Sequence, residues 1–382
     1  MIRAPVHRRR FLLLALAVAA CALRPGTDAR AQEPLVIGVG GPLTGQFELF
    51  GTSLRAGVEA AAGQANAAGG VDGRQLSVAV ADDACDAGKA PAAANQLVGA
   101  GAVFVVGHIC YSPTREAGAI YAAHAIVQIA PSTETDALTD RRPGPGLFRL
   151  APRASRQGYV AGTFMANRFP EAAIAILHDG TAYGKDLADR VKATLNAEGI
   201  QEVWFDQYPS GQKDYARIAG RLKDNAVNVV YLGGYHEDIA QIAVAIRDAG
   251  LETVIVGPDS LADSEYAALA GPAATGTFYT YLKPLPETPR AKLLGQIVDR
   301  EAAIDPRTFM LGYAAVERWI SAVNTAGSTD FDAVTGAMND GAAETVIGPV
   351  RFDGQGDWVT DGFAVFEWTA DGAKPVKTPG TD

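Results

Sequence analysis

The clearest structural signal in this chain is a pair of runs, LSVAVADDACD at residues 76–86 and AVFVVGHIC at residues 102–110. Each run is apolar on both faces until it reaches glycine, aspartate or cysteine, which is typical of a strand buried in a parallel sheet. In an open α/β sheet, the carboxyl ends of neighbouring strands line the crevice where ligands bind. We therefore predict a disulfide between Cys85 and Cys110 at two neighbouring strand ends, forming one wall of a binding cleft. A disulfide also requires an oxidising compartment.

An export signal is predicted at residues 1–32. Arginines at positions 8–10 precede the apolar run FLLLALAVAACAL at residues 11–23, which is too short to span a bilayer, and small residues at 29–31 offer a cleavage site. The arginines also resemble a twin-arginine signal, and the sequence ending at Cys21 resembles a lipoprotein cleavage box. We expect export to the periplasm, by the ordinary or the twin-arginine route. The soluble form is favoured over a lipid anchor at Cys21.

Charge and length narrow the class of protein. The full chain of 382 residues has a formal net charge of −10, and removal of residues 1–32 changes it to about −15. Such an acidic chain is not a partner for nucleic acid. Its length exceeds what one core usually fills, so two domains are expected. No later stretch approaches 18 uninterrupted apolar residues, so the sequence predicts no membrane insertion after the signal.

Short valine- and isoleucine-rich runs alternate with alanine-rich segments of helical period along the chain. The runs are PLVIGVG, QLSVAVA, AVFVVGH, IVQIAP, AIAILH, NVVYLGG and TVIVGP. Because they are apolar on both faces and separated by helices, the predicted fold class is α/β, with parallel sheets covered by helices on both sides. The sequence PGPG at residues 143–146 indicates that one sheet is complete there, and Ala173 begins a second.

The loop after the first strand lacks the spacing of a nucleotide-binding site. In VIGVGGPLTG at residues 36–45, Leu43 stands where a third glycine would be needed, and Pro42 removes a backbone donor from the phosphate turn. The histidines lack metal-ligand spacing, and no serine, cysteine or threonine stands in a nucleophile elbow. The sequence therefore predicts no enzyme activity, no cofactor and no metal.

Seven segments carry a family resemblance, in this order: GPLTGQFELFGTSLRAGVEAAAGQANAAGGVDGRQL, DDACD, GHIC, HDGTAYGKDLADRVKATL, YLGGYHEDIAQI, GPDSLAD and TVIGPVRFDGQGDW. They resemble the periplasmic leucine/isoleucine/valine-binding protein family, the substrate-binding components of ABC importers. The resemblance implies a type I periplasmic binding fold, in which two doubly wound parallel-sheet lobes are joined by a three-crossing hinge and close over a solute. It assigns residues 35–153 and 283–351 to the N-terminal lobe, and residues 154–282 and 352–375 to the C-terminal lobe.

The resemblance also implies ligand contacts. Asp259, which follows TVIVGP, matches the acid that meets a ligand's ammonium group in that family. Tyr183 and Tyr235 match the aromatic wall that the closing lobe brings over the ligand. Phe50 and Phe309 match apolar contacts to the ligand's side chain. Core packing is the alternative role for each aromatic residue.

The other half of the expected site departs from the family. Tyr111 stands where a hydroxyl after GHxC would hold a ligand carboxylate, and Glu134, in PSTET, stands where related sequences have threonine. Ser132 and Thr133 of the same segment are further candidate contacts. Ser112, with the proline after it, looks like the N-cap of a helix whose free amides can still meet an anion.

Glu134 has two interpretations, because a buried acid must be neutralised by one route or another. It pairs with Arg156 or Arg115, or it contacts a second positive or hydrogen-bond-donating group on the ligand. Unless Arg156 intervenes, a ligand carboxylate would be repelled by Glu134. We therefore expect leucine, isoleucine and valine to bind weakly or not at all.

The sequence thus predicts an exported, non-enzymatic binding protein that delivers a small polar solute to an ABC importer by lobe closure. The solute would be an amino acid or a related amine, amide or organic acid. The expected partners are this solute and the permease subunits of the transporter. The alternative is a sensor, in which the same two-lobe binder signals to a receptor or regulator, and an enzyme ranks third.

Overall fold

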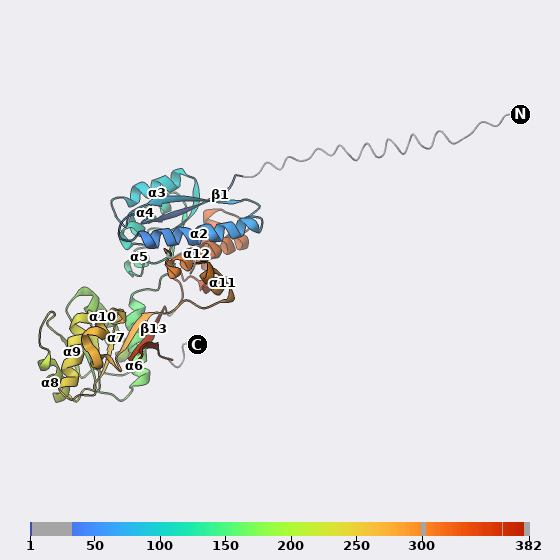
Figure 1. Cartoon of the computed structure of the whole chain (residues 1–382). Coiled ribbons are helices and arrows are strands. Elements are labelled where there is room, and N and C mark those ends of the chain that lie inside the picture. Colours follow the sequence, from blue (N-terminus) through green and yellow to red (C-terminus); the bar gives the residue numbers. More distant parts are fainter. Residues whose placement is uncertain (2–32, 299–302, 361, 378–382) are drawn as a thin grey trace.

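The computed structural model describes residues 1, 33–298, 303–360 and 362–377, which form two lobes joined by a few connecting segments (Figure 1). The predicted export signal, with its arginines and Cys21, lies outside the described residues apart from Met1. No described helix combines the length and the hydropathy that a bilayer span requires.

Parallel strands form the sheet of the first lobe, in the order β2-β1-β3-β4-β5. They are β1 (Leu35–Gly41), β2 (Leu76–Asp82), β3 (Ala102–Val106), β4 (Val127–Ala130) and β5 (Leu147–Arg149). The first four coincide with the predicted runs. Since β5 follows PGPG, the sheet continues beyond the point where the sequence indicates its end.

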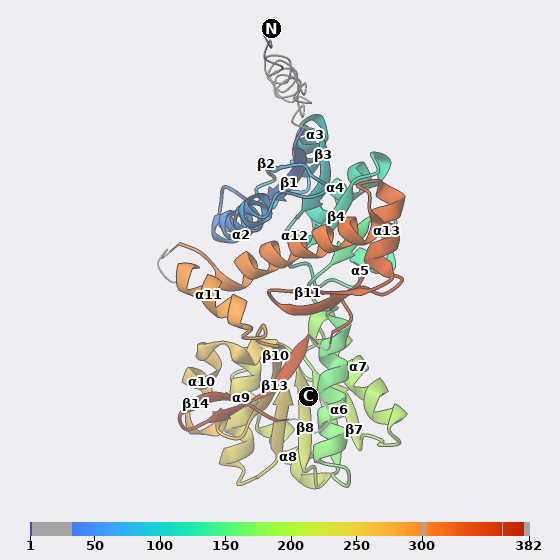
Figure 2. The same ribbon diagram turned by 90° about the vertical axis from the view of Figure 1, so that its right-hand side faces the viewer.

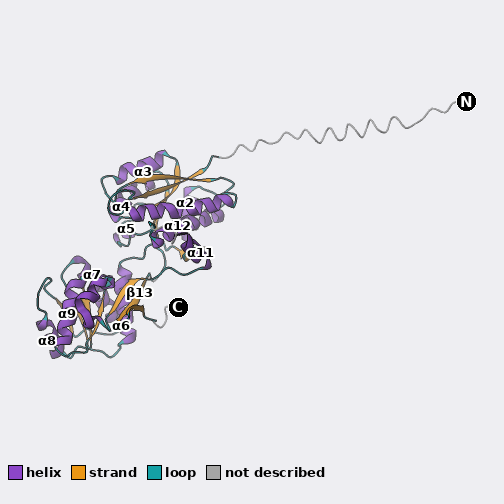
Figure 3. Cartoon of the chain, viewed as in Figure 1, coloured by secondary structure: helices purple, strands orange, loops and turns teal. Residues whose placement is uncertain are grey.

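Helices cover both faces of this sheet, as the two-faced apolar runs predict (Figure 3). One face packs against α2 (Glu48–Ala67) and α12 (Pro306–Ala326), and the other against α3 (Ala90–Gly99) and α4 (Tyr111–Ala123). Phe104 of β3 faces α12, where its ring stacks on Trp319 with centroids 5.1 Å apart. The next residue, Val105, belongs to the core on the opposite face. Because successive residues of a strand face opposite sides, one apolar run contributes to the cores on both faces of the sheet.

Two glycines allow α2 and α12 to approach closely. A Cβ atom on Gly57 would lie 2.1 Å from the carbonyl oxygen of Phe309, and one on Gly312 would lie 2.8 Å from that of Leu54. Both distances are too short for a side chain, so the backbones cross where side chains are absent. The crossing places the beginning of α12 beside the first turns of α2.

The sheet of the second lobe has the order β14-β13-β10-β9-β8-β6-β7 in the described residues. Its parallel strands are β6 (Ile174–His178), β7 (Trp204–Gln207), β8 (Val229–Gly233), β9 (Val254–Gly257) and β10 (Phe278–Leu282). The aromatic strands near the end of the chain, β13 (Phe363–Thr369) and β14 (Gly372–Pro375), extend this sheet in antiparallel fashion. The second sheet is therefore mixed and not wholly parallel.

Helices again lie on both faces of the second sheet. One face is covered by α6 (Ser155–Arg168) and α7 (Ala182–Ala197), and the other by α8 (Ala216–Asp224), α9 (His236–Asp248) and α10 (Ser264–Ala270). Short 3₁₀ segments, η1 (Asp259–Ala262) and η2 (Gly271–Ala274), precede and follow α10. The segment η1 follows β9 directly and carries Asp259.

Among the described residues, the chain passes between the lobes at three places: after β5, after β10 and before β13 (Figure 2). Between the second and third passages lie α11 (Pro289–Val298), α12, α13 (Phe331–Asn339) and the hairpin of β11 (Ala342–Thr345) and β12 (Gly348–Arg351). Residues of α12, α13 and β12 belong to the core of the first lobe. This threefold passage gives the hinge that the resemblance implies.

The predicted disulfide between Cys85 and Cys110 is present, with Cα atoms 5.6 Å apart. The two strands it follows are not neighbours, however, because β1 lies between β2 and β3 in the sheet. Buried His108 makes a second link across the same loops: its ring hydrogen-bonds to Asp83 and, at 3.0 Å, to the hydroxyl of Tyr121. A Cβ on Gly40 of β1 would meet this ring at 2.6 Å, so a glycine in the middle strand makes room for it.

We expect the cysteine pair to be oxidised in the mature protein, because the loops hold the two residues at bridging distance. Titration of thiols in the denatured, unreduced protein should find no free thiol at Cys85 and Cys110. Reduction before denaturation provides the positive control and should release two thiols. Two free thiols without reduction would contradict the prediction.

Candidate ligand-binding site

The predicted contact residues come from loops and helix starts that follow parallel strands in both lobes, where ligands bind in open α/β sheets. In the first lobe, they follow β1, β3 and β4: Phe50, Tyr111, Ser112, Ser132, Thr133 and Glu134. In the second lobe, they follow β6, β8 and β9: Tyr183, Tyr235 and Asp259. The two groups face each other, since the charge of Asp259 acts on Glu134 and Asp136 pairs with Arg190 of α7 at 3.2 Å.

Asp259 is held by two donors from neighbouring helices. The side-chain amide of Gln157, in α6, donates to Oδ1 of Asp259 at 2.7 Å, and the hydroxyl of Tyr183, in α7, donates to the same oxygen. Burial and then the nearby charge of Asp259 raise the pKa of Tyr183, so its hydroxyl keeps its proton and acts as a donor. The carboxylate of Asp259 is therefore fixed in orientation, and its second oxygen can accept from a ligand.

Tyr183 and Tyr235 form an aromatic pair beside this carboxylate. Their ring centroids are 5.2 Å apart and the planes are inclined by 30°. Tyr235 is the N-cap residue of α9 and remains 48% exposed, whereas Tyr183 is half-buried. An exposed tyrosine packed at a tilt against an anchored one offers an apolar surface to a ligand.

Glu134 follows β4 and lies opposite Asp259. Burial, and secondly the charge of Asp259, raise its pKa to about 7, while Arg307 and Arg149 act in the opposite direction. Neither ion pair suggested by the sequence forms: Arg115 pairs with Glu116, and Arg156 lies over the ring of Tyr159 at 4.6 Å.

The raised pKa of Glu134 predicts a pH-dependent contribution to the free energy of unfolding. A carboxyl group with a raised pKa stabilises the fold below its ordinary pKa of 4.5, and this contribution is lost as the pH rises through about 7. Because a tenfold change in proton affinity is about 1.4 kcal/mol, and Glu134 is partly exposed, we expect a loss of about 2 to 3 kcal/mol relative to Glu134→Gln. Chemical denaturation of the wild type and of Glu134→Gln, below pH 4.5 and above pH 7, measures this loss. A difference in the free energy of unfolding between the two proteins that does not change with pH would contradict the prediction.

The hydroxyls nearest the start of α4 are mostly engaged within the protein. Thr133 donates to the carbonyl of Ile109 at 3.0 Å, and Thr114 bonds to the carbonyl of Cys110 at 2.7 Å. Ser112 is not the N-cap, as the sequence suggested: α4 begins one residue earlier, with Cys110 as N-cap, and Ser112 is an exposed residue of the first turn. The hydroxyls of Thr114 and Thr133 are therefore already engaged within the protein.

Arg307, in the first turn of α12, also belongs to this region, although no sequence motif marks it. It is half-buried and donates from Nη1 to the carbonyl of Lys283 at 3.1 Å, in a segment connecting the lobes. Burial lowers its pKa, and the charge of Glu134 opposes that effect. Phe309, one half-turn further, is only 4% exposed and packs in the lobe core, whereas Phe50 is 37% exposed.

Arg149, at the end of β5, fixes the loop that carries Glu134. Its Nη1 donates to the carbonyls of Glu134 and Thr135, at 3.0 and 2.8 Å, and its Nε donates to Asp357 at 2.9 Å. Arg149 is fully buried. Its guanidinium therefore supports the backbone beneath the site and leaves the Glu134 carboxylate to other partners.

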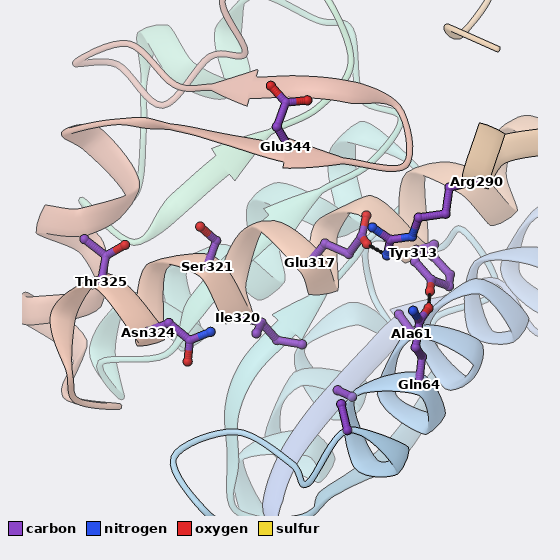
Figure 4. A pocket seen from close by; sticks show the side chains of 12 residues that line it. Ala61, Gln64, Arg290, Tyr313, Glu317, Ile320, Ser321, Asn324, Thr325 and Glu344 are labelled. Atoms are coloured by element: carbon purple, nitrogen blue, oxygen red, sulfur yellow. Dashed lines mark hydrogen bonds and ion pairs between the residues drawn. The ribbon is translucent and has the colours of Figure 1, made fainter. Parts of the chain in front are cut away.

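A separate hollow of about 510 Å³ lies between α2 and α12, with Glu344 of β11 at its rim (Figure 4). Four of its polar side chains already pair with each other: Arg290 with Glu317, and the hydroxyl of Tyr313 with Gln64. None of the predicted contact residues lines it. The lobe-facing residues remain the candidate site.

Comparisons with known proteins relate this arrangement to others. Residues 34–373 match the family model described as periplasmic binding protein. A Leu/Ile/Val-binding protein homolog 2 of Brucella abortus is 37% identical over 337 residues, covering 87% of this chain and 90% of that protein. A leucine-, isoleucine-, valine-, threonine- and alanine-binding protein of Pseudomonas aeruginosa is 35% identical over 365 residues, with coverage of 95% and 96%.

A solved structure supports the same fold. The substrate-binding protein of an ABC transporter from Desulfitobacterium hafniense, in complex with Leu, aligns with a TM-score of 0.68 at 23% identity. The alignment covers 90% of this chain and 100% of that one.

Proposed function

The chain belongs to the periplasmic binding protein family, and on this premise we propose that it is the substrate-binding component of an ABC importer for a small polar solute. The observation that carries the proposal is the lobe-facing Asp259, oriented by Gln157 and Tyr183 beside the exposed ring of Tyr235. The family consists of solute-binding proteins and not enzymes, so these groups would bind and orient without reacting.

Binding would proceed by lobe closure about the connecting segments. An N–H group of the solute would donate to Asp259, while the tyrosine pair packs on the apolar part and displaces water. The lobes would comprise residues 35–153 with 283–351, and residues 154–282 with 352–375, except that Phe352 and Trp358 pack in the core of the first lobe. Closure would bring Phe50, Tyr111, Ser112, Ser132, Thr133 and Glu134 onto the same solute.

The chain would act in the periplasm and deliver its solute to permease subunits of the transporter. The relatives quoted above are named as binding proteins, one of them of an ABC transporter, which favours transport over the alternative of a sensor coupled to a receptor. Export would depend on the segment before Glu33, whichever route it uses.

A thermal-shift screen of amino acids, amides, amines and small organic acids tests this function. A solute at about 100 times its Kd should stabilise the fold by about 2.7 kcal/mol, because it binds only the native state. Cells lacking this chain should then take up that solute more slowly, and the wild-type gene should restore uptake. If no solute of any class binds, or if uptake is unchanged, the proposal fails.

A further inference from the structure

The carboxylate of Glu134 lacks a protein partner. Among the described residues, it makes no hydrogen bond or ion pair, and only burial and more distant charges perturb it. Its backbone carbonyl is engaged, but its side chain is not. A partly buried carboxylate held in place by its own loop, yet without a donor, is suited to accept a hydrogen bond from a bound molecule.

The nearest cations do not fill this role. The guanidinium of Arg149 is committed to Asp357 and to carbonyls of the loop. Arg307 influences Glu134 through charge but lies outside ion-pair distance, and it donates to the carbonyl of Lys283 instead. Arg307 therefore offsets one negative charge of the site without covering the Glu134 carboxylate.

A second acid faces Glu134 from the other lobe. Asp136, two residues after Glu134, pairs with Arg190 of the second lobe at 3.2 Å, which brings this loop against that lobe, and the charge of Asp259 contributes to raising the pKa of Glu134. A molecule between them meets acceptors at both ends. Asp259 and Glu134 can each carry one negative charge and Arg307 carries one positive charge, so a singly positive solute balances the local charge, a neutral one leaves it unchanged and a carboxylate would increase the excess of negative charge.

We infer that the solute presents an N–H donor, and not a carboxylate, to Glu134, so that it is a small amide, urea or amine with donors at both ends. This rests on the proposed function and names its substrate class. The site would select against carboxylates in two ways: Glu134 repels them, and the hydroxyls of Thr114 and Thr133 are already bonded to backbone carbonyls. Glu134 would thus be a specificity-determining residue.

Matched pairs of acid and amide provide the test, with leucine against leucinamide, isobutyrate against isobutyramide, and benzoate against benzamide. Titration calorimetry of the wild type at about pH 7.5 should show that at least one amide binds. Its Kd should be lower than that of the matching acid by about tenfold or more, which is a difference of about 1.4 kcal/mol in binding free energy. Glu134→Thr and Glu134→Gln should reduce this preference by about tenfold or reverse it. Glu116→Gln removes a carboxylate that is paired with Arg115 on α4, and this control should keep the preference.

The outcomes separate this inference from the proposed function. An acid that binds the wild type more tightly than its amide overturns the inference and leaves the binding function standing. An amide preference that survives Glu134→Thr also overturns the inference. A best-binding solute without N–H donors does the same, and in both cases the binding function stands. If no solute of any class binds the wild type, both fail.

Discussion

Asp259→Ala is expected to weaken binding of the best solute from the screen by about 2 to 5 kcal/mol, as is usual when one side of a desolvated polar pair is removed. Asp259 lies at the carboxyl end of β9, where both a tyrosine hydroxyl and a glutamine amide orient its carboxylate. Calorimetry gives the loss of affinity, and thermal melting of the ligand-free protein gives any loss of stability.

The donors around Asp259 require a second variant. Alanine leaves the buried amide of Gln157 without its acceptor, which by itself costs about 1 to 3 kcal/mol. Asp259→Asn keeps an acceptor oxygen and removes the charge, so it should lose most of the affinity with a smaller change in melting temperature. A large loss of ligand-free stability in both variants, with affinity intact, would show that Asp259 braces the fold and does not hold the solute.

Arg149→Ala is expected to lower the free energy of unfolding by about 2 to 4 kcal/mol, because it removes the fully buried one of the two cations that pair with the buried carboxylate of Asp357 and leaves only Arg153. It also removes donors from the carbonyls of Glu134 and Thr135. Arg55→Ala, which removes an exposed pair with Glu59, should cost less than about 1 kcal/mol and serves as the control.

Urea unfolding of these variants measures the effect. Replacing both partners, as in Arg149→Met with Asp357→Leu, should recover part of the loss, since the penalty comes largely from a buried carboxylate that has lost one of its two cations. A loss below about 1 kcal/mol for Arg149→Ala would contradict the role of Arg149 in supporting the loop that carries Glu134.

Much of the fold could be predicted from local sequence, because strands buried on both faces form apolar runs that no surface segment imitates. The strand before Cys110 is of this kind, whereas most residues of the strand before Cys85 are only partly buried. β7 was harder to identify, since its residues are only partly buried and its burial does not alternate regularly. The antiparallel direction of β13 depends on a chain return that no local pattern encodes. Sheet order was likewise hidden, so β1 was not expected between β2 and β3.

The candidate site was predicted in part, through residues that follow strands within recognisable motifs. Asp259, Tyr183 and Tyr235 are of this type, and they lie together. No local motif marks Arg307 or Arg149, because Arg307 acts on Glu134 only through charge and Arg149 pairs with Asp357, and both carboxylates are far away in sequence. Phe309 illustrates the opposite case: its motif position suggests a ligand contact, whereas the close crossing of two helices buries it.

A crystal structure of the protein with the best-binding solute of the screen tests the central claim most directly. The account predicts the solute between the lobes, packed on Tyr183 and Tyr235, with an N–H group within hydrogen-bond distance of Asp259. A solute bound elsewhere, such as the hollow between α2 and α12, or one between the lobes without a contact to Asp259, would contradict it.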